Sequence, residues 1–200
     1  NIHIIKLIII NTRRGNMASP TNSRIKKVFF DVETNGFNYI RKHGNRHNII
    51  QIGALDQYGN TFNEMVKPEY PIHSLSTKCH HFTNKDVDNA NDFEKAYELF
   101  NEFIFINEYG ELDFDQTVCL IAHNNFGFDM YVLFKEIQSK GLKMSKNVVF
   151  FDTLVWFKTN IKLEYSISNP RPYSLGSLYV KEFNTEFENA HDAFSDVKAL

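Results

Sequence analysis

Apolar residues along this chain fall into short uninterrupted runs and into longer stripes interrupted by polar positions. Uninterrupted runs bounded by turn residues are typical of strands buried on both faces of a sheet. A Tyr58-Gly59-Asn60 turn joins two of these runs and indicates a hairpin. The runs predict five strands, at residues 25–32, 48–55, 61–66, 117–122 and 148–151.

Stripes with apolar residues three or four positions apart predict the helices. The clearest stripe begins after Asp92, a favourable N-cap residue, and continues to Ile104. Three more helices are expected, one after the fourth strand with Gly141 as its stop, and two at 174–183 and 193–200. Strands that alternate with helices predict an α/β domain, a mixed five-stranded sheet with helices on both faces.

Composition narrows the class of protein. The 200 residues suit one domain, and a hydrophobic content of 42% with 19 Phe fits a globular protein. The net charge of −2 argues against a strongly cationic nucleic-acid binder, although metal ions at an acidic site would restore positive charge there. Only Cys79 and Cys119 are present, so no disulfide framework is expected and an intracellular location, cytoplasmic or nuclear, is favoured.

The two ends of the chain stand apart from this pattern. The apolar stretch Ile2–Ile10 is far too short to span a bilayer, so no membrane partner is expected. We expect residues 1–23 to be a disordered or artefactual extension ahead of one domain at 24–200. Val197 and Leu200 still trace an apolar helical face at the last turn, which predicts that the final helix is incomplete.

Candidate chemistry lies in three segments, FFDVETNG at 29–36, AHNNFGFD at 122–129 and HDAFSD at 191–196. They supply four acidic residues and one histidine: Asp31, Glu33, Asp129, Asp196 and His191. Carboxylates that converge in space suit hard divalent cations, and two such ions side by side are a standard arrangement for cutting a phosphodiester.

The first two acids lie two positions apart on a predicted strand, so Asp31 and Glu33 point to the same face while Val32 points to the other. The alternative is an edge strand whose acidic side chains face solvent. The apolar residues around them indicate a central buried strand instead, where two unpaired carboxylates would be costly. The pair therefore favours a metal site.

Asp129 falls in the first turn of the helix after the fourth strand. Acids are favoured there because of the helix dipole, so a capping role is the alternative to metal binding, and both can hold at once. Asn124 and Asn125 are suited to cap this helix, and Gly127 allows a close approach of the backbone to a substrate. Asn124 is also a candidate donor to a phosphate or sugar oxygen.

His191 and Asp196 are five residues apart, a rotation of about 500° along a helix, which would point them roughly 140° apart. They converge only if His191 lies on a loop before the helix, with Asp192 as the N-cap. A loop histidine beside a metal-bound water suits a general base, because imidazole titrates near neutral pH. An exposed histidine at a helix start is the alternative.

The three segments resemble the motifs of DEDDh-type 3′→5′ exonucleases of the ribonuclease H-like fold. This group includes proofreading subunits of bacterial replicative polymerases, ribonuclease T and oligoribonuclease. The resemblance covers residues 25–200, and the absence of a Tyr four positions before Asp196 indicates the histidine branch. His81-Phe82-Thr83 is similar to a His-Gly-Ile-Thr segment of the group, with Phe82 in the place of glycine, and Tyr173-Ser174-Leu175 precedes the third motif as the family pattern has it.

The resemblance implies a hydrolase with two metal ions, Mg²⁺ or Mn²⁺, in an exonuclease domain. Asp31, Glu33 and Asp196 would hold one ion beside the attacking water, from which His191 would remove a proton. Asp31 and Asp129 would hold the second ion near the leaving 3′ oxygen. Three residues would line the pocket for the terminal nucleotide, mainly through backbone contacts: Thr34, Asn35 and Gly36. The products would be nucleoside 5′-monophosphates from the 3′ ends of single-stranded DNA or RNA.

Other functions stay open at this point. A catalytically inert nucleic-acid-binding module would be expected to lack a site residue, and none of the five is missing. A phosphodiesterase for very short oligonucleotides is the second alternative, and DNA and RNA are not distinguished. A polymerase or replication partner, or a homodimer, fits the family. Two basic groups are candidates for phosphate contacts: Arg41, Lys42, His43, Arg46 and His47, and Lys140, Lys143 and Lys146. A zinc site is disfavoured, because Cys79, His80, His81, Cys119 and His123 match no finger spacing.

Overall fold

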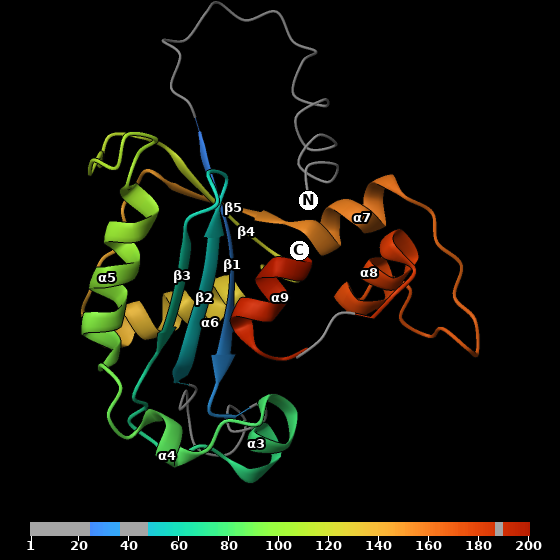
Figure 1. Ribbon diagram of the computed structural model, residues 1–200, viewed down its shortest axis with the longest axis horizontal. Coiled ribbons are helices and arrows are strands. Elements are labelled where there is room, and N and C mark those ends of the chain that lie inside the picture. Colours follow the sequence, from blue (N-terminus) through green and yellow to red (C-terminus); the bar gives the residue numbers. More distant parts are fainter. Residues whose placement is uncertain (1–24, 37–47, 187–189) are drawn as a thin grey trace, which may run out of the picture.

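The computed structural model describes residues 25–36, 48–186 and 190–200. Five strands form one mixed sheet in the order β3-β2-β1-β4-β5 (Figure 1). The pairs β1/β2 and β2/β3 are antiparallel, and β1/β4 and β4/β5 are parallel. The strands are β1 (Lys26–Thr34), β2 (Ile49–Asp56), β3 (Thr61–Met65), β4 (Val118–Ala122) and β5 (Val148–Asp152).

Helices lie on both faces of this sheet, as predicted (Figure 1). α5 and α6 cover one face, while α9 packs on the other with α7 and α8 beside it (Figure 1). Two shorter helices, α3 and α4, lie beyond the end of β1 and the start of β2 (Figure 1). The described helices are α3 (Ser74–His80), α4 (Asn84–Val87), α5 (Phe93–Phe105), α6 (Asp129–Ser139), α7 (Thr153–Asn160), α8 (Leu175–Phe183) and α9 (Ala193–Ala199).

Successive side chains of β1 point to opposite faces of the sheet, and this determines which helices each side chain contacts. Val28, Phe30 and Val32 are buried in the large core beneath α5 and α6. Phe29 points the other way and packs with Val197 of α9. Burial of one such side chain stabilises the fold by about 1.5–3 kcal/mol. Because Asp31 and Glu33 share the parity of Phe29, both acids fall on the face that α9 covers.

The predicted elements are confirmed, with boundaries shifted by one or two residues. Asp92 caps α5 by accepting from the Lys95 N–H at 2.9 Å, and Ser174 caps α8 through the Ser177 N–H at 3.3 Å. Three helices were not predicted. α3 and α4 span only seven and four residues, and α7 buries only Thr153, so none shows an apolar stripe.

The predicted extension at residues 1–23 lies outside the described residues. Within the part of the chain that the structure describes, no helix is both long and apolar enough to cross a membrane.

Candidate active site

The first-motif acids lie near the end of β1, on the face that α9 covers. Glu33 is only 6% exposed, and the regular pairing of β1 with β2 is interrupted directly after it. Burial and the nearby Asp196 carboxylate raise the pKa of Glu33 to about 9. Such a group is costly to ionise unless a positive charge is supplied.

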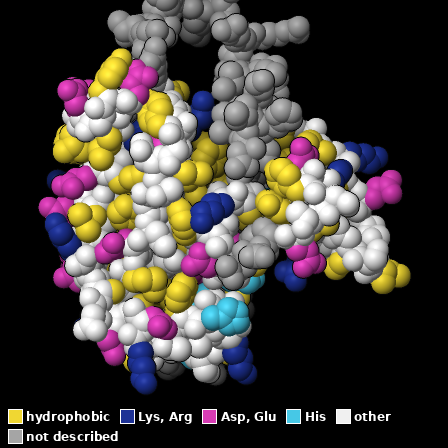
Figure 2. Space-filling model, viewed as in Figure 1, with side chains coloured by type: hydrophobic (Ala, Val, Ile, Leu, Met, Phe, Trp, Pro, Cys, Tyr) yellow, Lys and Arg dark blue, Asp and Glu magenta, His cyan; other side chains and the backbone are white. Residues whose placement is uncertain are grey.

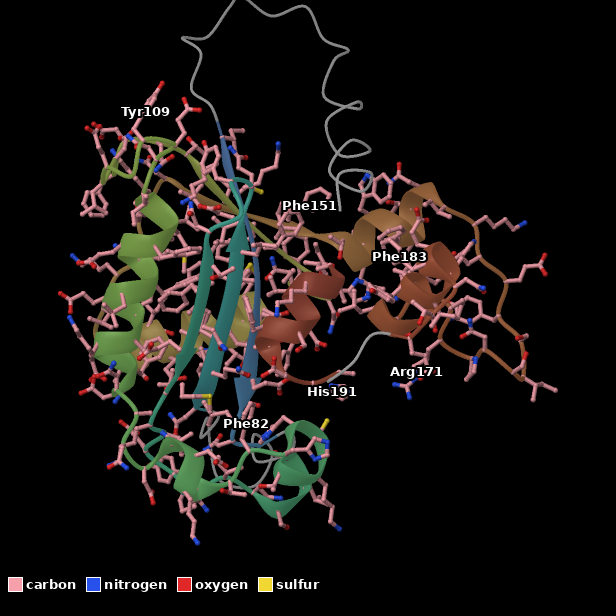
Figure 3. The ribbon with its side chains drawn as sticks, viewed as in Figure 1. Phe82, Tyr109, Phe151, Arg171, Phe183 and His191 are labelled. Carbon is pink, nitrogen blue, oxygen red and sulfur yellow. The ribbon has the colours of Figure 1, made fainter. Side chains whose placement is uncertain are left out.

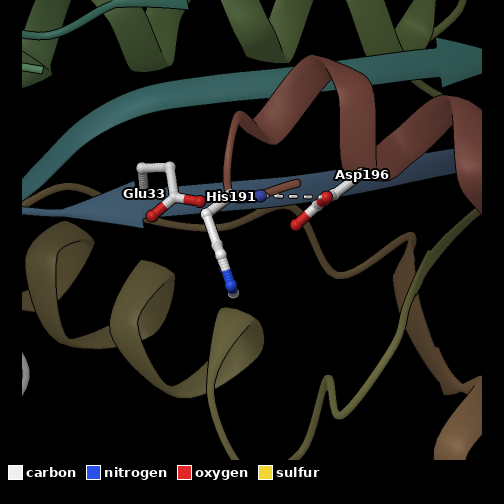
Figure 4. A group of neighbouring side chains, drawn as sticks. All are labelled: Glu33, His191 and Asp196. Carbon is white, nitrogen blue, oxygen red and sulfur yellow. Dashed lines mark hydrogen bonds between the residues drawn. The ribbon is translucent and has the colours of Figure 1, made fainter. Parts of the chain in front are cut away.

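The third motif adopts the predicted loop-then-helix arrangement. Asp192 is the N-cap of α9 and accepts from the Ser195 N–H at 2.9 Å. His191 precedes it with a left-handed φ of +68°, and the backbone N–H of His191 donates to Asp196 Oδ1 at 3.3 Å (Figure 4). Glu33, His191 and Asp196 each offer a ligand atom within 4.8 Å of the others. The two ends of the third motif therefore converge on the first.

Asp129 of the second motif is the first residue of α6 and is 1% exposed. Its Oδ1 accepts from the Val32 N–H at 3.1 Å, which fixes it beside the strand segment that carries both first-motif acids. Burial raises the pKa of Asp129 to about 7, although this backbone hydrogen bond opposes the shift. All three motifs thus meet at one end of β1.

Burial, together with repulsion between carboxylates, governs the electrostatics of this cluster. Burial and the carboxylates of Asp129 and Asp196 raise the pKa of Asp31 well above its ordinary value. Burial also raises the pKa of Asp196 to about 6. Within the described residues, no lysine or arginine forms an ion pair with any of the four acids. A set of oxygen donors this crowded and uncompensated fits hard divalent cations.

These motifs and this sheet have known counterparts, because the exonuclease family matches residues 28–200. The chain belongs to the exonuclease family. It is 30% identical over 177 residues to the PolC-type DNA polymerase III of Streptococcus pneumoniae, covering 86% of this chain and 10% of that protein. It is 34% identical over 86 residues to human three prime repair exonuclease 2, covering 42% and 36%. The chain therefore spans about a tenth of the polymerase relative and about a third of the human one.

Among solved structures, the zinc-bound E. coli ExoI complex with single-stranded DNA has a TM-score of 0.66 and 19% identity, over 88% of this chain and 38% of that one. This likeness confirms the ribonuclease H-like fold that the sequence resemblance predicted. In the space-filling view, histidine side chains reach the surface near α3, below α9, with acidic side chains nearby (Figure 2).

Asp152, at the end of β5, is a buried site neighbour that sequence reasoning missed. Its two oxygens accept from the N–H groups of Asn124, at 3.1 Å, and Phe126, at 3.0 Å, and it also caps α7. It thereby shapes the loop that leads to Asp129. The signal was an Asp directly after an apolar strand, which is a typical N-cap position.

The loop of the second motif differs in detail from the prediction. Asn125 does serve the start of α6, since its Oδ1 accepts from the Met130 N–H at 3.1 Å. Asn124 does not cap the helix: it has a left-handed φ of +65°, and its side chain lies against Gly127. A Cβ at Gly127 would be 2.5 Å from Asn124 Oδ1, so this glycine makes room for a side chain of the same chain.

The three residues expected to line the nucleotide pocket, Thr34, Asn35 and Gly36, are buried where β1 ends. The Asn35 N–H donates to the Asn48 carbonyl at 3.0 Å, and the Asn35 carbonyl accepts from the His73 N–H at 2.8 Å. The backbone of Asn35 is therefore already bonded inside the chain. The Thr34 hydroxyl has no hydrogen-bond partner among the described residues.

The segment after α3 contains His81 and Phe82, two residues of the predicted family-like segment. His81, the C-cap of α3, has a left-handed φ of +68°, the conformation that glycine favours. Phe82 instead packs near Ile50 and stacks on His80, with ring centroids 5.4 Å apart. The prediction that Phe82 replaces the family's glycine stays a prediction, and the glycine-like backbone conformation in this segment belongs to His81. Phe82 and His191 lie on the same side of the molecule, near the end of β1 (Figure 3).

The predicted basic groups have different outcomes. The first, within 37–47, lies outside the described residues. In the second, Lys140 forms ion pairs with Glu69 at 2.6 Å and Glu94 at 3.4 Å, while Lys143 and Lys146 have no ion pair within the described part of the chain. Among those same residues, no cysteine belongs to a group at metal-ligating distance.

Proposed function

We propose that this chain is a metal-dependent 3′→5′ exonuclease that releases nucleoside 5′-monophosphates from the 3′ ends of single-stranded DNA or RNA. One observation carries the proposal: Glu33, His191 and Asp196 converge beside Asp31 and Asp129 in a cluster of uncompensated carboxylates. The name of the human relative, three prime repair exonuclease 2, supports the direction. The single-stranded DNA in the ExoI complex supports the substrate class.

The four acids would hold Mg²⁺, with Mn²⁺ as a substitute, because carboxylate oxygens suit both ions. Two such ions, when bound, neutralise the phosphate and favour formation of hydroxide from water at neutral pH. The chain's own part is to hold the donors. The β1 backbone places Asp31 and Glu33, the bond from the Val32 N–H places Asp129, and α9 places Asp196.

His191 would act as the general base. The backbone N–H of His191 donates to Asp196 at 3.3 Å, and the imidazole ring makes no hydrogen bond to another described residue. The exposed imidazole can therefore accept a proton from a water held between Glu33 and Asp196 and pass it to solvent. The histidine is placed by its left-handed backbone, so substitution of the side chain would leave the loop in place.

A role beside a polymerase is part of the proposal, since the 30%-identical relative is a PolC-type DNA polymerase III. In that setting the single-stranded 3′ end would come from a growing strand. The chain matches 10% of the polymerase, so the partner would lie in other parts of the same protein or in a separate one.

The test is a degradation assay on DNA and RNA oligomers of about 20 nucleotides, labelled at either end, with and without Mg²⁺. A 3′→5′ exonuclease shortens 5′-labelled strands stepwise and releases labelled mononucleotide at once from 3′-labelled strands. Internal cuts, or cleavage that survives chelation of metal, would contradict the proposal. Dinucleotide substrates in parallel separate this activity from that of a short-oligonucleotide phosphodiesterase, and comparison of DNA with RNA settles the sugar.

A further inference from the structure

The N-terminal end of α9 rests on β2, at two residues that face the first-motif acids across the β1/β2 pair. In the antiparallel register Glu33 lies opposite Gln51, and Asp31 lies opposite Gly53. Directly opposed residues in such a pair are the closest side-chain neighbours in a sheet. The strand that aligns the first motif therefore also touches the element that carries the third.

Gln51 connects β2 to α9 through its side-chain amide, which is 1% exposed. Its Oε1 accepts from the Ala193 N–H at 3.0 Å, and its Nε2 donates to Asp192 Oδ2 at 3.0 Å. Ala193 begins α9, so its N–H is one of the donors that a helix cannot satisfy internally. Asp192 is the N-cap, held from its other oxygen by the Ser195 N–H. One amide thus secures both the cap and the first turn.

Gly53 leaves the space in which α9 sits. A Cβ at this position would lie 2.6 Å from both Ala193 C and Phe194 N, closer than real Cβ atoms approach backbone. Its φ lies outside the left-handed region, so the requirement is for space rather than for backbone freedom. Glycine weakens a strand interior, and its presence in a central strand indicates close backbone approach.

We propose that Gln51 and Gly53 are positioning residues that dock α9 so that Asp196 and His191 meet Glu33. Neither residue touches the reacting atoms; each acts through the backbone of 192–194. Apolar packing of Val197 against Phe29 determines which face of α9 meets the sheet. The hydrogen bonds of Gln51 then fix where along the strand the helix begins. The expected catalytic consequences rest on the proposed exonuclease function.

The first comparison is Gln51→Met, which keeps volume and removes both bonds to α9, against Asn63→Ala. Asn63 Oδ1 accepts from Gln51 Nε2 at 3.0 Å on the β3 side, so its loss leaves the α9 bonds in place. We expect Gln51→Met to weaken Mn²⁺ binding and lower kcat by about 10- to 100-fold, the usual effect of removing a group that orients a metal ligand. KM for the oligonucleotide should stay near the wild-type value, and Asn63→Ala should stay within about twofold on every measure.

A second test exchanges donor and acceptor in the hydrogen bond between the side chains of residues 51 and 192. Gln51→Glu still accepts from the Ala193 N–H but opposes the Asp192 carboxylate, so α9 should loosen. Adding Asp192→Asn supplies an amide donor to the new carboxylate and keeps a good N-cap oxygen. The double variant should regain at least about tenfold in kcat over Gln51→Glu alone, a recovery that a general loss of stability would not produce.

Amide hydrogen exchange across 190–200 supplies a readout that does not depend on nuclease activity. Exchange at Ala193 and Ser195 should rise in Gln51→Met and Gly53→Ala and return toward wild type in the double variant. Wild-type exchange and wild-type Mn²⁺ affinity in folded Gln51→Met would overturn the positioning proposal, as would no recovery in the double variant. If the wild-type protein neither cleaves nor binds Mn²⁺, the proposed function fails, and the exchange comparison still decides the positioning.

Discussion

The two ends of β1 both bury charge, and they treat it in opposite ways. At its start, Lys26 is 1% exposed and its Nζ lies 3.2 Å from Asp56 Oδ2. The same ammonium donates to the carbonyls of Phe103, at 2.9 Å, and Ile106, at 2.7 Å. Burial lowers the pKa of Lys26, while the Asp56 carboxylate opposes that shift. This charge finds its partners inside the chain.

At the other end, Asp31 and Glu33 meet Asp129 and Asp196 with no lysine or arginine paired to them among the described residues. Burial and the neighbouring carboxylates raise the pKa values of both Asp31 and Glu33. Two sites on one strand thus differ in whether other residues in the described part of the chain neutralise their charge. Where they do, the role is structural. Where they do not, the crowded carboxylates suit a cation from solution, which is the basis of the proposed metal site.

The largest expected effect comes from removing one carboxylate of the acidic cluster near the end of β1. Asp31→Ala should reduce cleavage to below detection, because this carboxylate is central to the cluster, while the fold persists since the change relieves crowding. Steady-state assays and circular dichroism measure the two outcomes. Mg²⁺-dependent cleavage by the purified variant would contradict the site assignment.

Removal of the proposed base should slow cleavage without emptying the metal site. His191→Ala is expected to cost about 10²- to 10⁴-fold in rate and to flatten the acidic limb of the pH–rate profile. Asp196→Ala should weaken metal binding as well. A Mg²⁺ titration of both variants separates the roles: an equal rise in the metal requirement would make His191 a ligand, and near-normal rates would remove it from catalysis.

A substitution at the start of β1, where Lys26 is paired with Asp56, should change the stability of the fold and not the catalytic rate. Lys26→Met leaves the 3%-exposed Asp56 without its cation and should lower the free energy of unfolding by about 3–5 kcal/mol. Urea unfolding measures this loss, and the kcat of the folded fraction should match wild type. A selective loss of kcat with unchanged stability would show that the two ends are not separate in role.

A smaller effect concerns the pH dependence of the metal-free protein. The folded state holds protons on Glu33, with a pKa of about 9, and on Asp129, with a pKa of about 7, that the unfolded state has released. The free energy of unfolding should therefore fall as pH rises from about 5 to about 9, because the unfolded state binds fewer protons. Saturating Mg²⁺ should remove this fall. Metal-free stability that rises over the same interval would contradict the raised pKa values that burial and repulsion give these acids.

Much of this comparison could be predicted where the deciding pattern is local. Alternation along β1 put Asp31 and Glu33 on one face, and helix geometry required His191 to precede α9, as it does. The Gln51 contacts could not be predicted, because they join residues 141 and 142 positions apart. The left-handed backbone of His81 could not be predicted either, because its residue type does not indicate it.

The central claim is that the acidic end of β1 takes its missing positive charge from a bound divalent cation. Calorimetric titration of Mn²⁺ into the metal-free protein near pH 7, in two buffers of different ionisation enthalpy, tests it most directly. Binding should be accompanied by net proton release, because cations displace protons from carboxyl groups with raised pKa values, and Asp31→Ala should lose most of both signals. No binding, or binding that Asp31→Ala leaves unchanged, would contradict the claim.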